Sequence, residues 1–255
     1  MKIATWNVNS LTVRLDQVIE WVKEYKPDVL GLQEIKLTDD KFPLGAFREL
    51  GYNAVFSGQK TYNGVAIISK ETPSEVVKEF PDYNDVQRRV LAATIDGVRV
   101  LNVYIPNGAS LDSDKYQYKL AWLERLLAYT KAQLAQYERV VLMGDFNIAP
   151  ADIDVHEPAL WKDSVLCSEA ERAVFRALIN LGMVDMFRAL NTDAQYSWWD
   201  YRQGAFHRNL GLRIDHILVN TDFASNCTEV GIDRATRKLE RPSDHAPVWA
   251  SLVRH

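Results

Sequence analysis

The sequence has few cysteines and no long apolar run. Its two cysteines, Cys167 and Cys227, lie far apart in the chain and form no metal-ligand pattern, so both are expected to be reduced core residues. No stretch approaches the roughly 18 consecutive apolar residues of a membrane span. The segment Met1–Trp6 also lacks the apolar run of a signal peptide. These absences predict a cytoplasmic protein that does not bind a membrane.

The chain also lacks internal repeats, low-complexity tracts and a Gly/Ser-rich linker, so one domain over residues 1–255 is expected. Hydrophobic residues make up 47% of the chain, which is enough for a sizeable core. A basic surplus is missing too: 30 lysines and arginines against 34 acidic residues give a net charge of −4. Phosphate-binding proteins usually show such a surplus, but charge can be segregated on one face. Net charge therefore neither supports nor excludes a nucleic-acid substrate.

What the sequence does contain is a series of apolar, strand-like runs separated by a few helical patterns. The pair Asp96-Gly97 between two such runs predicts a hairpin, because it supplies the positive φ angles of a two-residue turn. Helices are expected over Leu15–Val22, ending before Pro27, and over Asp114–Tyr137. A third carries Val174, Leu178 and Leu181, with Gly182 as its stop. The runs are Ile3–Val8, Val29–Gln33, Gly64–Ser69, Val90–Ile95, Val98–Ile105, Val140–Gly144, Arg213–Val219 and Ala246–Val253.

Because helices interrupt the strands while several neighbouring strands form hairpins, the pattern favours two packed, largely antiparallel sheets with helices outside. A doubly wound parallel sheet fits it less well.

Polar clusters follow the apolar runs at their ends, where a rigid scaffold can direct side chains into one cleft. A hard Mg²⁺ ion prefers carboxylate and amide oxygens, so Glu34 with Asn7 or Asp244 is a candidate site. His245 can be oriented and kept positive by a carboxylate such as Asp215. Asp145 and Asn147 alternate and would share one face of a regular strand. The clusters are Trp6-Asn7-Val8-Asn9-Ser10, Gln33-Glu34-Ile35-Lys36, Gly144-Asp145-Phe146-Asn147, Arg213-Ile214-Asp215-His216 and Ser243-Asp244-His245.

With these clusters, the chain resembles the exonuclease III family of DNA-repair nucleases along essentially its whole length. The order and spacing of the matching segments are jointly specific. They are Trp6-Asn7-Val8-Asn9-Ser10, Leu32-Gln33-Glu34-Ile35-Lys36, Asn63-Gly64-Val65-Ala66, Asn102-Val103-Tyr104-Ile105-Pro106, Gly144-Asp145-Phe146-Asn147-Ile148-Ala149-Pro150, Gly211-Leu212-Arg213-Ile214-Asp215-His216 and Pro242-Ser243-Asp244-His245-Ala246-Pro247.

The resemblance implies an α/β fold, a DNase I-like four-layer sandwich of two mainly antiparallel sheets flanked by helices. It implies one or two Mg²⁺ ions, replaceable by Mn²⁺, with Glu34 as the principal ligand. It also implies that Asp145 either activates the attacking water or protonates the leaving oxygen. The implied catalytic residues are Tyr104, Asp145, Asn147, Asp215 and His245, and the implied metal site comprises Asn7, Glu34, Asp145, Asn147, Asp244 and His245.

The implied substrate is duplex DNA with abasic sites or 3′ ends, acted on by a monomer. Substrate contacts are expected from Asn9, Arg88, Lys119, Trp198 and Leu212, with Trp198 as a wedge into the base stack. Simpler roles remain open: Asn9 bonding a loop, Tyr104 as a strand aromatic, Asp215 capping a turn and Trp198 in the core. The rival functions are a phosphoinositide phosphatase or sphingomyelinase of the same fold, and a DNA-binding protein without catalysis.

Overall fold

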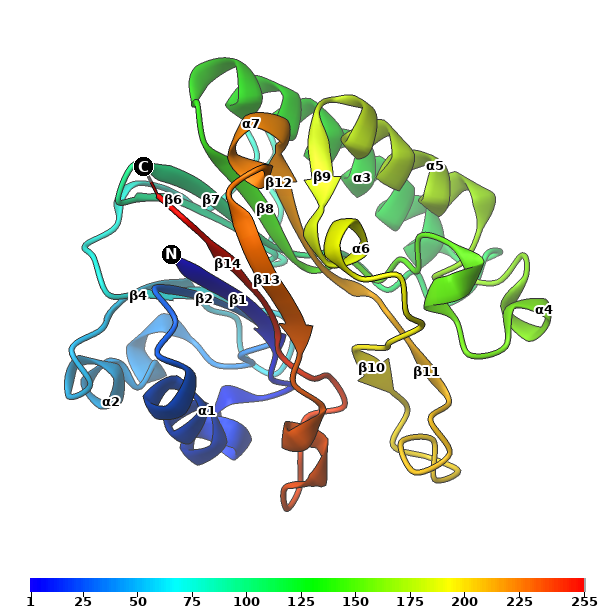
Figure 1. The fold of residues 1–255 in the computed structure, drawn as a ribbon, viewed down its shortest axis with the longest axis horizontal. Coiled ribbons are helices and arrows are strands. Elements are labelled where there is room, and N and C mark those ends of the chain that lie inside the picture. The colour runs from blue at the N-terminus through cyan, green and yellow to red at the C-terminus, as the bar shows by residue number, and fades with distance from the viewer. Residues whose placement is uncertain (255) are drawn as a thin grey trace.

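The computed structural model describes residues 1–254, which form two six-stranded sheets packed face to face with helices on their outer faces (Figure 1). In spatial order, the first sheet contains β13 (Cys227–Ile232), β14 (Val248–Leu252), β1 (Lys2–Asn7), β2 (Val29–Gln33), β4 (Val65–Ser69) and β3 (Asn53–Ser57). The second contains β5 (Ser74–Val77), β6 (Val90–Ile95), β7 (Val98–Tyr104), β8 (Val140–Asp145), β12 (Asp215–Asn220) and β9 (Met183–Asp185).

Each sheet has one parallel pair, β1 with β2 and β7 with β8, and its other pairs are antiparallel. A parallel pair needs a long crossover, and α1 (Leu11–Tyr25) and α3 (Asp114–Gln136) provide the two crossovers. The expected sandwich of mainly antiparallel sheets is confirmed. The other helices are α2 (Leu44–Arg48), α4 (Pro158–Trp161), α5 (Glu169–Asn180), α6 (Met186–Leu190) and α7 (Thr221–Ala224), with short 3₁₀ turns η1 (Asp39–Lys41), η2 (Asp152–Asp154) and η3 (Arg234–Lys238).

The period-two alternation of the strands builds the layers. In β1, Ile3 faces the core between the sheets, whereas Ala4 and Trp6 pack under α1. Thr5 and Asn7 have the same phase as Ile3, and both are fully buried. One face of β1 thus packs against α1, while the other face directs Asn7, at the end of the strand, toward the space between the sheets.

Local signals set several element ends as expected. Asp96 and Gly97 both have positive φ angles and connect β6 to β7 as a hairpin. Helix α1 ends at Tyr25, where Lys26 takes the left-handed conformation, and α5 ends before Gly182, whose φ is +106°.

The sequence expectations missed the four edge strands, β3, β5, β9 and β13, and the two-residue strands at Trp198–Trp199 and Gly211–Leu212. The four edge strands are only partly buried, so they lack the apolar runs of central strands. Cys167 is buried as expected, but Cys227, at the start of β13, is only half-buried, and both thiols are free. Among residues 1–254, no helix is both long enough and apolar enough to span a membrane.

Candidate active site

The candidate catalytic side chains gather where strands of both sheets begin or end. Asn7, Tyr104 and Asp145 are the last residues of β1, β7 and β8, and Glu34 follows β2 directly. Strand β12 runs antiparallel to β8, so its first residue, Asp215, pairs with Asp145. Strand β14 is antiparallel to β1 in the same way, which brings the segment before it, with His245, to this end. Strand direction thus assembles one site from distant sequence segments.

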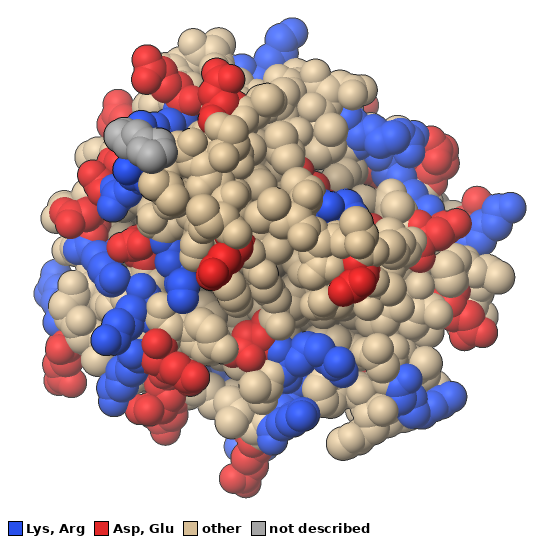
Figure 2. Space-filling model, in the orientation of Figure 1, with Lys and Arg blue, Asp and Glu red and all other residues tan. Residues whose placement is uncertain are grey.

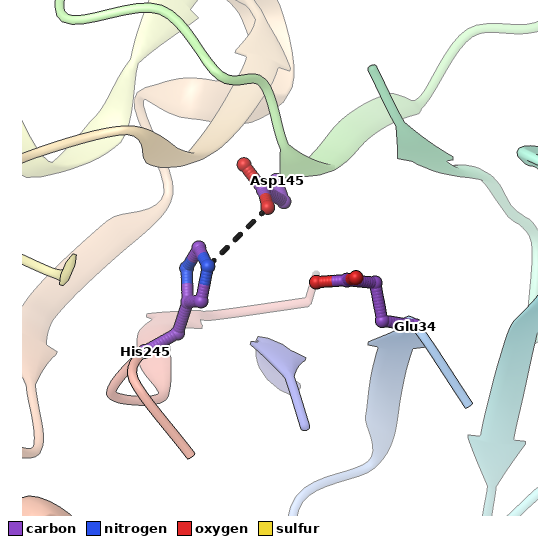
Figure 3. A group of neighbouring side chains, drawn as sticks. All are labelled: Glu34, Asp145 and His245. Atoms are coloured by element: carbon purple, nitrogen blue, oxygen red, sulfur yellow. Dashed lines mark ion pairs between the residues drawn. The ribbon is translucent and has the colours of Figure 1, made fainter. Parts of the chain in front are cut away.

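The side-chain amide of Asn7 bridges two carboxylates across the gap between the sheets. Its Nδ2 donates to Glu34 Oε2 at 2.7 Å and to Asp145 Oδ2 at 2.8 Å. Ligand atoms of Glu34, Asp145 and His245 all lie within 4.8 Å of one another, as Figure 3 illustrates. Such a group of oxygen and nitrogen donors can hold a metal ion.

His245 lies between two aspartates. Its Nδ1 is 2.8 Å from Asp215 Oδ2, and its Nε2 is 3.5 Å from Asp145 Oδ2 (dashed in Figure 3). Burial opposes the charged imidazolium, but the carboxylates of Asp215 and Asp145 outweigh it and raise the pKa of His245 well above its ordinary value. The site therefore holds a charged imidazolium, oriented by Asp215.

Burial also shapes the ionisation of Asp145 and Tyr104. It raises the pKa of the Asp145 carboxyl to about 7, although the charge of His245 and the amide of Asn7 act in the opposite direction. Burial, with the carboxylates of Glu34 and Asp145, raises the pKa of Tyr104 well above its usual range. Asp145 can therefore exchange a proton near neutral pH, while Tyr104 remains a neutral hydroxyl donor.

Asn147 does not continue the β8 strand. Its φ is +50°, and its backbone N–H turns back to donate to Asp145 Oδ1 at 3.0 Å. Its own amide donates to the carbonyl of Ile105 at 2.8 Å, and Asn107 donates to its Oδ1 at 3.3 Å. The expected alternation of Asp145 and Asn147 on one strand face is thus replaced by a tight turn that brings both residues to the site.

Residues 4–245 match the Endonuclease/Exonuclease/phosphatase family. The chain belongs to this family. The resemblance to exonuclease III is confirmed by a relative of 38% identity, the Exodeoxyribonuclease III of Haemophilus influenzae, over 99% of this chain and all of the relative.

Two solved structures of this family share the fold across the whole molecule. One is the 3′ phosphatase NExo from Neisseria bound to a product DNA hairpin, 49% identical, with a TM-score of 0.97 and full coverage of both chains. The other is an AP endonuclease from Archaeoglobus fulgidus, 42% identical, with a TM-score of 0.95 and 99% of each chain covered. The chain is therefore similar to DNA-processing members of the family from end to end.

Asp244, an expected metal-site residue, and Asn9, an expected substrate contact, lie beside the Glu34 group. The carboxylate of Asp244 accepts hydrogen bonds from Trp198 Nε1 at 3.0 Å and from Asn9 Nδ2 at 3.4 Å. The Oδ1 of Asn9, in turn, accepts from Lys36 Nζ at 2.6 Å. Asp244 and Asn9 thus tie the loops around the site together, and the carboxylate of Asp244 is not part of the group that contains Glu34.

Trp198 and Trp199 form a short strand, β10 (Trp198–Trp199), paired with β11 (Gly211–Leu212). Trp199 is fully buried, whereas Trp198 is half-buried and packs on a cluster that includes Leu212 and Leu166. Leu212 has no exposed surface. It is the cross-strand partner of Trp198 and is covered in this structure, so it does not line an open pocket, and a direct substrate contact from Leu212 stays a prediction.

Two basic residues expected to touch substrate have neighbours that are better placed. Lys119 is fully buried behind the site, whereas Lys115, one turn earlier on α3, is exposed and lines a cleft of about 460 Å³ beside Tyr104. Arg88 is paired with Glu79 at 2.6 Å, whereas Arg89 lies over the Tyr104 ring at 4.7 Å and lines the same cleft. Arg89 and Lys115 therefore line the cleft beside Tyr104, whereas the ammonium group of Lys119 is buried behind it.

The alternation along β6 indicates, from the sequence alone, which side of the sheet Arg89 faces. Leu91 and Ala93 face the core between the sheets, so a residue two positions before Leu91 shares their side. Asn107, which also lines the cleft and bonds Asn147, follows the Tyr104-Ile105-Pro106 segment and was not singled out from the sequence. No local pattern distinguishes it from an ordinary turn asparagine.

Proposed function

We propose that this protein is a metal-dependent DNA-repair phosphodiesterase of exodeoxyribonuclease III type. It would hydrolyse 3′-terminal phosphodiesters, 3′-phosphates and the backbone 5′ to abasic sites in duplex DNA. The observation that carries the proposal is the charged His245 beside Asp145, with a carboxylate oxygen of Glu34 within 4.8 Å of ligand atoms of both. This arrangement combines a cation for a phosphate oxygen, a proton-exchanging carboxyl and a metal-ligating carboxylate at one site.

The chemistry follows from the charges. A phosphodiester resists attack because its negative charge repels nucleophiles, and the imidazolium of His245 lowers that charge. Asp145, turned by the Asn147 N–H, either takes the proton of the attacking water or protonates the leaving oxygen. The neutral hydroxyl of Tyr104 donates to a phosphate oxygen. In either case, the buried Asp215 keeps His245 oriented and charged.

The donor set fits a hard divalent ion such as Mg²⁺. Glu34 Oε2 accepts from Asn7, and Glu34 Oε1 lies 4.0 Å from Lys36 Nζ. The Glu34 side chain is 20% exposed, so its carboxylate is accessible for ligation. Mg²⁺ is commonly held by one or two carboxylates and keeps several waters. When bound, the ion would neutralise phosphate charge and polarise the P–O bond. A protonated His245 has no free lone pair, so we assign ligation to Glu34 rather than to His245. Asn7 holds Glu34 through its Nδ2 donor, while its Oδ1 accepts from the N–H of Asn9 at 3.0 Å.

DNA as the substrate is supported by the relatives, which include an exodeoxyribonuclease, a 3′ phosphatase with a DNA hairpin and an AP endonuclease. Figure 2 shows lysines and arginines interspersed with acidic residues on the face it presents. Binding of the phosphate backbone would therefore depend on local cations such as Arg89 and Lys115. None of these relatives is a phosphoinositide phosphatase or a sphingomyelinase. The monomeric state and the cytoplasmic location remain predictions.

The proposal is tested with three duplexes, carrying an abasic site, a 3′-phosphate or a recessed normal 3′ end. Each is incubated with Mg²⁺, with Mn²⁺ and with chelator, and products are resolved by length. We expect Mg²⁺-dependent cleavage of at least one duplex and none in chelator. Activity on an inositol phosphate or on sphingomyelin, with none on the duplexes, would contradict the proposal.

We propose Trp198 as the residue that supports an unstacked base step at damage. Stacking of an aromatic ring on a base is worth roughly 1–3 kcal/mol, so Trp198→Ala should reduce kcat/KM on abasic duplex about ten- to a hundredfold. Removal of a 3′-phosphate from a frayed end needs less unstacking and should suffer less. Trp198→Phe, which keeps a ring but removes the hydrogen bond to Asp244, is the matched control. Equal losses on both duplexes, with a lowered Tm, would mean that Trp198 serves only packing.

A further inference from the structure

An ion pair without solvent exposure lies behind the catalytic turn. Lys119 of α3 and Glu171 of α5 are in direct contact, and neither side chain has any exposed surface. Burial lowers the pKa of Lys119, and the adjacent Glu171 partly opposes this shift. Apolar replacements of buried pairs are often neutral or stabilising, so fold stability alone is a weak explanation for this one.

The ammonium group of Lys119 is fully used. Besides Glu171, its Nζ donates to the carbonyl of Asn147 at 2.7 Å and to the carbonyl of Asn107 at 3.1 Å. These are the two residues whose side chains meet at the turn beside Asp145. Since a lysine has three N–H donors, all three are directed at one carboxylate and the backbone of this turn.

The carboxylate of Glu171 holds a second segment. Its Oε1 accepts from the N–H of Leu166 at 3.1 Å, and its Oε2 accepts from the N–H of Ser168 at 3.0 Å. The carbonyl of Leu166 accepts from the N–H of Ala149 at 2.9 Å, which returns the connection to the segment after Asn147. Leu166 packs in the same cluster as Trp198. The pair therefore connects the catalytic turn to the loop that supports Trp198.

We infer that Lys119 and Glu171 are positioning residues that hold Asn147, and through it Asp145, in a reactive geometry. Asn147 has a positive φ, a conformation that a non-glycine residue keeps only where its surroundings enforce it. Lys119 holds this conformation by donating to the Asn147 carbonyl. Glu171 pairs with Lys119 and accepts from the N–H groups of Leu166 and Ser168 in the adjoining loop. The kinetic consequence rests on the proposed function, whereas the structural consequence does not.

A double-mutant cycle tests whether Lys119 acts through Asn147. Displacement of a catalytic group by about 1 Å can cost about a hundredfold in rate. Lys119→Met should therefore lower kcat about ten- to a hundredfold with little change in KM. In an Asp145→Ala background, where the turn no longer has a carboxylate to position, the same substitution should cost nothing further. If Lys119→Met lowers kcat by the same factor in both backgrounds, Lys119 does not act on Asp145 through Asn147.

Two further variants separate positioning from stability. Lys119→Met/Glu171→Met leaves no unpaired buried charge, so it should fold and still show the low kcat. Arg99→Met is the matched control, because Arg99 is 2% exposed and bonds Gln133 at the opposite end of β7. It should lower the Tm without lowering kcat. Equal kcat losses in Arg99→Met and in the paired variant would overturn the inference.

Amide hydrogen exchange gives a readout that needs no activity. In the paired variant, the amides of Asn147 and Leu166 should lose protection, whereas those of Leu142 in central β8 should not. Unchanged protection at Asn147 and Leu166 would overturn the coupling, whatever the substrate is. Failure of the three-duplex assay with wild-type protein would instead contradict the proposed function alone.

Discussion

His245→Ala and Asp145→Asn are each expected to lower kcat by roughly 10²- to 10⁴-fold, the usual contribution of a positioned acid or base. His245 supplies a charge, held by Asp215, to the phosphate, and Asp145 exchanges a proton with water or the leaving oxygen. The measurement is single-turnover cleavage of abasic duplex at saturating Mg²⁺. Losses below tenfold in both variants would remove these residues from the chemical step.

Their effects should not add. His245 Nε2 and Asp145 Oδ2 lie 3.5 Å apart. The Asp145 carboxylate raises the pKa of His245, and the charge of His245 lowers the pKa of Asp145. Residues that act as a unit lose most of their effect with the first deletion, so the double variant should be little slower than the slower single variant. Full multiplication of the two losses would show that they serve separate steps.

The melting temperature of Asp145→Asn at two pH values tests whether its loss of activity comes from unfolding. Burial raises the pKa of Asp145 from 3.8 to about 7 in the folded protein. The folded state therefore favours the protonated carboxyl, and stability falls as the pH rises through this window. In chelator, Asp145→Asn should melt a few degrees above wild type at pH 8 and not above it at pH 4. This gain is limited because the variant lacks the Asp145 carboxylate that stabilises the imidazolium of His245. A lower Tm at pH 8 would contradict the shift.

Glu34→Gln should abolish metal-supported cleavage, with a loss of at least about 10³-fold, because a Lewis-acid ion supplies several kcal/mol. Glu34 offers the accessible carboxylate oxygen of the site, and an amide in its place has no negative charge for the ion. Calorimetric titration with Mg²⁺ should show binding to wild type and none to Glu34→Gln at millimolar ion.

Asp244→Asn is the matched control for Glu34→Gln. Its carboxylate accepts from Asn9 and Trp198 and lies outside the Glu34 group, so the variant should still bind Mg²⁺. Loss of binding in Asp244→Asn equal to that in Glu34→Gln would make Asp244 a metal ligand beside Glu34. Wild-type rates in excess chelator would refute a metal mechanism altogether.

Much of the fold was predictable because its signals are local. Strands such as β1, β2 and β8 are buried on both faces and read as apolar runs, and Asp96-Gly97 marked a hairpin. Edge strands β3 and β13 pair on one side only and carry mixed side chains, so no run marked them. The sequence order of motifs was also sufficient to place the chain in the right family.

The sequence by itself determined which residues stand at strand ends, since periodicity and turn residues are properties of adjacent positions. Only the tertiary structure decided which of them meet. Asp215 reaches His245 because β12 is antiparallel to β8, and Asn7 reaches Asp145 because the two sheets pack face to face. Lys119 illustrates the same limit: the family resemblance implied a substrate contact, but the buried face of α3 and the opposing Glu171 place it inside. Contacts between distant segments depend on packing that no local pattern encodes.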